Sequence, residues 1–163
     1  MAYLRKYYWD ACVWIDLITQ SNADRFRRCQ NVFSQAQKGE VELWTSSITL
    51  TEVYKRKCDG DLTSMPEDQD DEFESFFESG LVKPILLDLQ VAKVARRLCR
   101  KHPILRKPQD AVYVASCIVS NIDELHTFDI QDLIRLDGQI LLKNSTPLKI
   151  SEPPAPLPKL FDP

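Results

Sequence analysis

Apolar runs alternate along this chain with amphipathic stretches, and the two patterns predict strands and helices in turn. The runs at 7–10, 41–47, 81–88 and 123–129 have the length and the aromatic or aliphatic content of buried strands. A fifth strand is expected at 138–142. Helices are expected after Asp10, between Asn22 and Gly39, at 48–57, before Gly80, at 89–102 and at 110–122. Strands that alternate with helices predict a parallel α/β sheet covered by helices on both faces.

Local signals refine this picture at three points. Asn22 is a helix-capping residue, and Gly39 stands where a left-handed helix end favours glycine. Pro84 cannot donate a hydrogen bond to a neighbouring strand, so it predicts that the strand 81–88 lies at an edge of the sheet. The helix at 110–122 is apolar nearly all round, which indicates a buried position.

Length and composition predict one folded domain with a tail. The 163 residues are 44% hydrophobic and 28% charged, the balance of an ordinary globular protein. Residues 1–145 are expected to form the domain, and the proline-rich residues 146–163 an extended C-terminal tail. The net charge of −3 does not indicate a nucleic-acid-binding protein, so that function would require local basic patches.

Two further features predict where the protein acts. No apolar run approaches the roughly 20 residues of a membrane helix, so no membrane association is expected. The five cysteines form no CxxC pair, and we interpret them as reduced and mostly buried in a cytoplasmic protein.

Four acidic residues stand where the carboxyl ends of the predicted strands should meet. Asp10 ends the first strand, Glu52 follows the second, Asp110 begins the buried helix, and Asp129 ends the fourth. Sites in parallel α/β sheets lie at this edge, so we expect the four carboxylates to converge. Together they would need a compensating cation, and Mg²⁺ or Mn²⁺ prefers such oxygen ligands. Each acid taken alone has an ordinary explanation as a helix cap, a turn residue or an exposed side chain.

The segments "WDACVWI", "SSITLTEVYK", "KPQDAVYVASCI" and "LHTFDIQDL", in this order, resemble the PIN-domain ribonucleases, especially toxins of the VapC type. The resemblance covers roughly residues 5 to 145. It implies a PIN-like, three-layer α/β/α sandwich with a central parallel sheet of four to five strands. It also implies a Mg²⁺- or Mn²⁺-dependent endoribonuclease in which Asp10, Glu52, Asp110 and Asp129 bind the metal.

The resemblance has further implications and two departures. Thr127 matches a hydroxyl residue that supports the acidic set, RNA would be the substrate, and an antitoxin and a second copy of the chain would be partners. Cys12 stands where the family usually has Ser, Thr or Asn, and a thiol is a weak hydrogen-bond donor. Asp129 and Asp132 both fit the fourth acid, and we favour Asp129 because it is nearer the strand.

Basic residues flank the acids in sequence. Lys55 and Arg56 follow Glu52, and Arg106 and Lys107 precede Asp110, so the four are candidates for contacts with substrate phosphates. The basic residues of the helix 89–102 are equally well explained as a solvated face. Two other functions remain open: a PIN-fold module that binds RNA or protein without cleaving, and a metal-dependent phosphatase on the same sheet edge.

Overall fold

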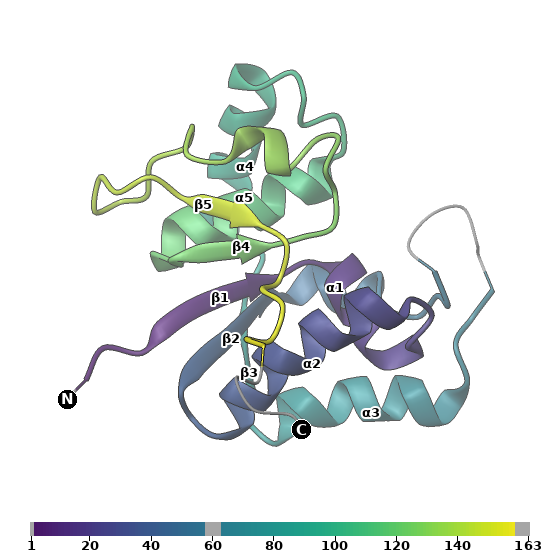
Figure 1. Ribbon diagram of the computed structural model, residues 1–163. Coiled ribbons are helices and arrows are strands. Elements are labelled where there is room, and N and C mark those ends of the chain that lie inside the picture. The colour runs from purple at the N-terminus through teal and green to yellow at the C-terminus, as the bar shows by residue number, and fades with distance from the viewer. Residues whose placement is uncertain (1, 58–62, 159–163) are drawn as a thin grey trace.

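A parallel sheet of five strands forms the centre of the computed structural model, which describes residues 2–57 and 63–158 (Figure 1). The strands follow the order β3-β2-β1-β4-β5 across the sheet, and every neighbouring pair is parallel. They are β1 (Arg5–Trp9), β2 (Val41–Ser46), β3 (Val82–Ile85), β4 (Glu124–His126) and β5 (Lys149–Ser151). This order confirms the predicted fold class, and it places the Pro84 strand at an edge, as expected.

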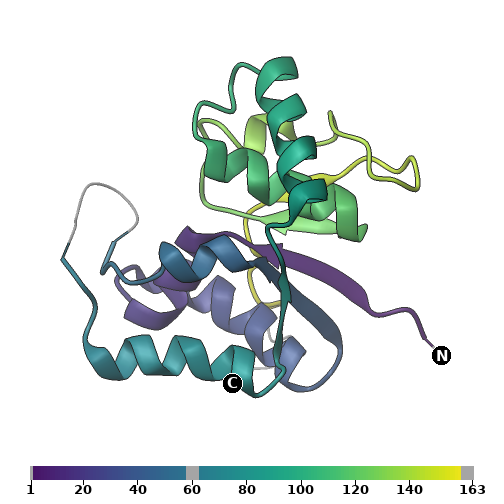
Figure 2. The same cartoon turned by 180° about the vertical axis from the view of Figure 1, so that it is seen from behind.

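Helices cover both faces of the sheet in the described part of the chain. They are α1 (Ala11–Thr19), α2 (Ala23–Gln37), α3 (Glu67–Glu78), α4 (Leu89–Lys101), α5 (Pro108–Ser120) and the short 3-10 helices η1 (Ser47–Thr51) and η2 (Ile134–Leu136). Figure 1 shows α4 and α5 on one side of the sheet and α1, α2 and α3 on the other, and Figure 2 shows the same layers from behind.

Alternating side chains of β1 divide the core between the two faces. Tyr8 packs with the apolar residues of α4 and α5, whereas Tyr7 and Trp9 pack with those of α1, α2 and α3. This two-residue alternation is what a strand buried on both faces requires. The arrangement leaves the carboxyl ends of β1, β2 and β4 open to one rim of the molecule.

The predicted helix at 48–57 is wrong. The chain forms the 3-10 helix η1 and then a turn, and Lys55 pairs in an isolated bridge with Ser64. Side chains compete here with helical hydrogen bonding: the Thr51 hydroxyl donates to the Ile48 carbonyl over 2.7 Å. Ser and Thr commonly divert a backbone from the α-helix in this way. Glu52 therefore lies just after a short helical turn.

The fifth strand is not at 138–142, where we predicted it. Ile140 and Leu142 are buried in the core, and the chain turns back so that Lys149–Ser151 pairs with β4 instead. Both segments are short and partly apolar, and tertiary packing selects between them. β5 falls inside the segment 146–163 that was assigned to the tail; residues 159–163 of that segment lie outside the described residues, as do 58–62 of the acidic loop.

One other sequence expectation is met in the described residues. Asn22 caps α2, because its side chain accepts a hydrogen bond from the Arg25 backbone amide over 3.0 Å. Among the helices within residues 2–57 and 63–158, none has the length and apolar content needed to cross a membrane.

Candidate metal and nucleic-acid site

Asp10 begins the site, directly after β1. Its side chain caps α1 by accepting a hydrogen bond from the Val13 amide over 3.0 Å. The other carboxylate oxygen accepts a hydrogen bond from the Thr127 hydroxyl over 2.5 Å. The carboxylate is almost fully buried, at 3% exposure. Asp10 is thus a helix cap and a buried acid at the sheet rim at the same time.

Thr127 joins Asp10 to the segment that follows β4. Its hydroxyl oxygen also accepts a hydrogen bond from the backbone amide of Asp129 over 3.0 Å. The Asp129 carboxylate in turn accepts bonds from the amides of Gln131 and Asp132, at 3.1 Å and 2.9 Å. These bonds fix a tight turn, because side-chain acceptors of this kind replace backbone partners. The turn therefore places the carboxylates of Asp129 and Asp132 close to each other.

Among the described residues, Asp110, Asp129 and Asp132 form a close group of three potential metal ligands. One carboxylate oxygen from each lies within 4.8 Å of the others. Asp110 comes from the first turn of α5, and the other two come from the turn after β4. The structure therefore brings together both candidates for the fourth acid, including Asp132, which we had set aside.

Glu52 reaches the same rim from the turn after η1. It accepts a hydrogen bond from the Tyr113 hydroxyl, and Tyr113 lies one helical turn after Asp110 on α5. Residues three apart on a helix share a face, so the spacing Asp110–Tyr113 already pointed both side chains the same way. We did not predict Tyr113, although this spacing is visible in the sequence.

One cavity of about 670 Å³ contains all of these acids. Its lining includes every acid of the predicted set together with the two residues just described: Asp10, Glu52, Asp110, Tyr113, Asp129 and Asp132. The four predicted acids thus line one cavity, whereas the close cluster consists of Asp110, Asp129 and Asp132 without Asp10 and Glu52. Metal binding by these acids depends on their charge and on carboxylate oxygens that have no other partner.

Burial makes the negative charges at this rim costly. The pKa of Asp10 is raised to about 7, mainly by burial; the hydrogen bonds from Thr127 and Val13 oppose this rise, and the charges of Asp110 and Asp129 add to it. Burial raises the pKa of Asp110 to about 6, although Lys107 opposes the shift. Burial also raises the pKa of Glu52, whereas the hydrogen bond from Tyr113 lowers it. Neighbouring carboxylates in a desolvated site hold their protons unless a cation joins them.

The donor set fits a hard divalent cation. Among the described residues, the second carboxylate oxygen of Asp110 is buried and has no hydrogen-bond partner. A buried oxygen of this kind requires a partner, because leaving it unmatched costs roughly 1–3 kcal/mol or more. The cavity offers only carboxylate oxygens as anionic ligands, and Mg²⁺ and Mn²⁺ prefer these.

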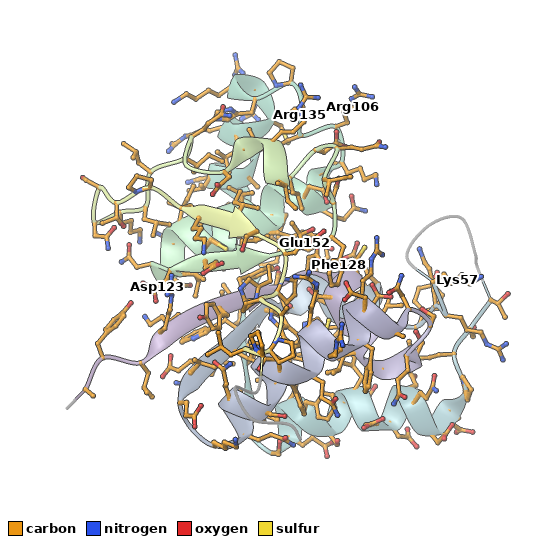
Figure 3. The ribbon with its side chains drawn as sticks, viewed as in Figure 1. Lys57, Arg106, Asp123, Phe128, Arg135 and Glu152 are labelled. Carbon is orange, nitrogen blue, oxygen red and sulfur yellow. The ribbon has the colours of Figure 1, made fainter. Side chains whose placement is uncertain are left out.

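Cations line the cavity on both sides of the sheet. Lys55 and Lys107, two of the four basic residues singled out in the sequence, are part of the lining. Arg56 and Arg106 are exposed and lie outside it. Figure 3 shows Arg106 at the outer end of the α4–α5 layer, apart from Phe128, which lines the cavity.

Arg25 is a third cation of the cavity, and no sequence signal predicted it. Its guanidinium pairs with Asp16 over 3.3 Å and stacks on the Phe128 ring at 4.7 Å from the ring centre. Asp16 is itself buried, at 7% exposure, so it holds the arginine in place. Because Arg25 belongs to α2 and Lys107 to the start of α5, the two cations approach the acids from opposite faces of the sheet.

Cys12 also lines the cavity, next to the helix that Asp10 caps. It is disulfide-bonded, whereas Cys29, Cys99 and Cys117 are free. The prediction that all the cysteines are reduced is therefore wrong for Cys12. A free thiol, the weak hydrogen-bond donor expected at this position, is therefore not present at Cys12.

These features define a PIN domain. A sequence model of the PIN domain family matches residues 7–139, so the chain belongs to that family. The match includes all the acids that line the cavity. A search of curated proteins gives no match to the sequence.

Solved structures with a similar fold include a VapC toxin and two toxin–antitoxin complexes. The Mycobacterium tuberculosis VapC20, a sarcin-ricin loop cleaving toxin, is 16% identical with a TM-score of 0.57, over 76% of this chain and 89% of that one. VapBC2 from Rickettsia felis, bound to a DNA fragment from its promoter, is 17% identical with a TM-score of 0.58, over 89% and 98%. A toxin-antitoxin complex from Klebsiella pneumoniae is 18% identical with a TM-score of 0.54, over 78% and 89%.

Proposed function

We propose that this PIN-domain protein is a metal-dependent endoribonuclease, the toxin of a type II toxin–antitoxin pair. The observation that carries the proposal is the convergence of Asp10, Glu52, Asp110 and Asp129 in one cavity, where an oxygen of Asp110 is buried without a partner in the described structure. Asp132 lies beside Asp110 and Asp129 and would be a further ligand. Such a set suits phosphodiester hydrolysis better than a purely structural role.

These carboxylates would hold Mg²⁺ or Mn²⁺, which when bound polarises a phosphoryl oxygen and lowers the pKa of a coordinated water. The protein supplies orientation. Thr127 donates to Asp10 and accepts from the Asp129 amide, so it keeps two of the acids at a constant separation. Tyr113 holds Glu52 toward the cavity.

The cavity cations would bind the phosphates next to the scissile bond. Lys55 follows η1, Lys107 precedes α5, and Arg25 belongs to α2, so the three cations come from separate parts of the chain. Phosphate contacts fix the register of a nucleic-acid strand without reading its sequence. Hydrolysis at such a site would leave a 5′-phosphate and a 3′-hydroxyl, as the family resemblance implies.

RNA and an antitoxin are proposed from the structural relatives. VapC20 cleaves the sarcin-ricin loop, which supports RNA as the substrate class. Two of the similar structures are toxin–antitoxin assemblies, which supports an antitoxin as a partner. A homodimer and a cytoplasmic location complete the proposal.

The test is cleavage of a fluorescently labelled RNA by the purified protein with Mn²⁺ or Mg²⁺. Asp10→Asn and Asp110→Asn should each lower the rate at least ~100-fold, because each removes a charged ligand from the cation that stabilises the reacting phosphate. Asp71→Asn makes the same chemical change at an exposed position of α3 and should leave the rate unchanged.

A chelator should stop the reaction, and added metal should restore it. Cleavage that persists in Asp10→Asn or in excess chelator would contradict the proposed mechanism. RNA binding without any cleavage by the unmodified protein would instead favour the non-catalytic PIN module.

A further inference from the structure

The segment 89–109 contains an unusual concentration of positive charge. It carries seven Lys and Arg residues and no Asp or Glu, in a chain whose 24 acids outnumber its 21 Lys and Arg. The seven are Lys93, Arg96, Arg97, Arg100, Lys101, Arg106 and Lys107, and we call them the basic ridge. Since the whole chain is acidic, this charge is a local property of α4 and the loop that follows.

Helical spacing places the α4 cations on its outer face. Val91, Ala95 and Leu98 are buried against the core, whereas all five basic residues of α4 are exposed. Positions separated by three, four, seven and eight residues form one stripe along a helix. At 1.5 Å per residue, the stripe from Lys93 to Lys101 is about 12 Å long.

Apart from Lys107, whose charge lowers the pKa of Asp110 and of Glu52, the basic ridge is not neutralised by the protein. Within the described chain, none of its seven residues forms an ion pair with an acid. α4 packs against α5, whose only acid is Asp110 in the cavity. The exposed face of α2 is different, because Arg27 and Arg28 there pair with Asp24 at 3.2 Å and 3.1 Å.

The ridge leads into the candidate site. Arg106 follows α4, and Lys107 is both the residue before α5 and part of the cavity lining. The basic residues therefore continue from the outer face of α4, beyond the loop 102–105, to Lys107 at the cavity. A face that was merely solvated would have no reason to exclude acids or to end at the cavity.

We propose that the basic ridge is a docking surface for the phosphate backbone of an RNA that extends beyond the cavity. The proposal rests on the nuclease function argued above and specifies its substrate class, a folded RNA rather than a short single strand. RNA is the occupant that the charge favours, because unpaired cations in a row match a regularly charged polymer. Lys107 would bind near the scissile bond, and the α4 stripe would bind phosphates farther along.

The experiment compares two triple variants in an Asp10→Asn background, which prevents cleavage during binding. Arg96→Gln/Arg97→Gln/Arg100→Gln removes three ridge charges and keeps side chains that favour helix. Arg27→Gln/Lys38→Gln/Lys143→Gln removes the same net charge from exposed positions elsewhere. The probes are a fluorescein-labelled RNA hairpin and a labelled tetranucleotide, followed by fluorescence anisotropy at several salt concentrations.

The ridge variant should bind the hairpin about tenfold or more weakly than the control variant, with a salt dependence reduced by about two to three counterions. Its affinity for the tetranucleotide, which fits the cavity alone, should change less than about twofold. A merely structural role for α4 would not alter the salt dependence, and thermal unfolding of both variants checks that they fold.

Equal hairpin binding by the ridge and control variants would overturn the proposal. Displacement of the hairpin by polyglutamate as readily as by unlabelled RNA would also overturn it, because the surface would then suit an acidic protein. A change of oligomeric state without a change in RNA binding, measured by light scattering, would assign the face to a dimer instead. If the unmodified chain cleaves no RNA in metal, the proposed function fails, independently of the ridge.

Discussion

Tyr113 shows how one side chain outside the acidic set can control it. Its hydroxyl donates to Glu52, and its ring lies buried against Tyr8 at 5.8 Å between ring centres. The ring is therefore held by packing, and the hydroxyl has a defined position at the cavity. In the proposed function Tyr113 would be a positioning residue, since it would act on the substrate through Glu52.

Replacing Tyr113 with Phe should weaken metal use without disturbing RNA binding. Loss of one hydrogen bond to a charged group removes roughly 1.5–3 kcal/mol, so the Mn²⁺ concentration for half-maximal cleavage should rise about 10-fold or more. The KM for RNA should stay the same. Tyr54→Phe changes an exposed tyrosine near the same turn and is the control; an unchanged Mn²⁺ requirement in Tyr113→Phe would refute the role.

For single residues, the sequence predicts the acidic residues of the site better than the residues that hold them in place. Asp10, Asp110 and Asp129 could be placed because strand ends and helix starts determine which rim they occupy. Lys55 was singled out correctly as a neighbour of Glu52, although the helix expected to carry it does not form. Arg25 could not be found this way, because its position depends on how α2 packs and on the pairing with Asp16.

Among the elements, α4 combines a well-formed start with an unusual surface. Asp88 caps the helix by accepting a hydrogen bond from the Val91 amide over 2.9 Å. Its negative charge also favours the helix N-terminus. The helix that presents the basic ridge is therefore anchored by one side chain at its first turn.

Asp88→Ala should lower the free energy of unfolding by about 1 kcal/mol, the usual loss at a helix cap. Urea denaturation followed by circular dichroism measures this difference. Asp88→Asn retains an oxygen that can cap and should recover most of the loss. Equal destabilisation by both replacements would show that charge, rather than the capping hydrogen bond, is responsible.

Helices and strands were predicted correctly where apolar residues recur regularly along the chain. The predictions failed where a segment could adopt either of two local conformations or where either of two segments could form the strand. α4 and α2 were located closely because their apolar residues recur at helical spacing over several turns. The segment 48–57 has a similar apolar spacing, but its Ser and Thr side chains hydrogen-bond to the backbone and give η1. For the fifth strand, two short apolar segments were available, and only the pairing with β4 distinguishes them.

Across the whole molecule, the buried acids link stability to pH and, if they bind the proposed cation, to metal. The folded-state pKa values of Asp10 and Asp110 are raised to about 7 and about 6, above the ordinary value of 3.8. Between these values the folded state holds protons that the unfolded state releases. The metal-free protein should therefore become more stable as the pH falls from 8 toward 5, by a few kcal/mol at most.

The melting temperature in chelator should accordingly rise as the pH is lowered over this range. Mn²⁺ should raise it strongly at pH 8 and weakly at pH 5, because protons and metal compete for the same oxygens. Asp10→Asn should flatten the pH dependence and reduce the metal effect. A metal-free protein that loses stability on acidification from pH 8 to pH 6 would contradict this account.

The two edges of the sheet limit how a partner can join the molecule. β3 contains Pro84, which cannot donate to an added strand, and β5 has three residues. Short or proline-containing edges are common defences against edge-to-edge aggregation. A partner protein would then gain little by extending the sheet as an additional strand. Its binding segment should instead lie across helices and contact them through side chains.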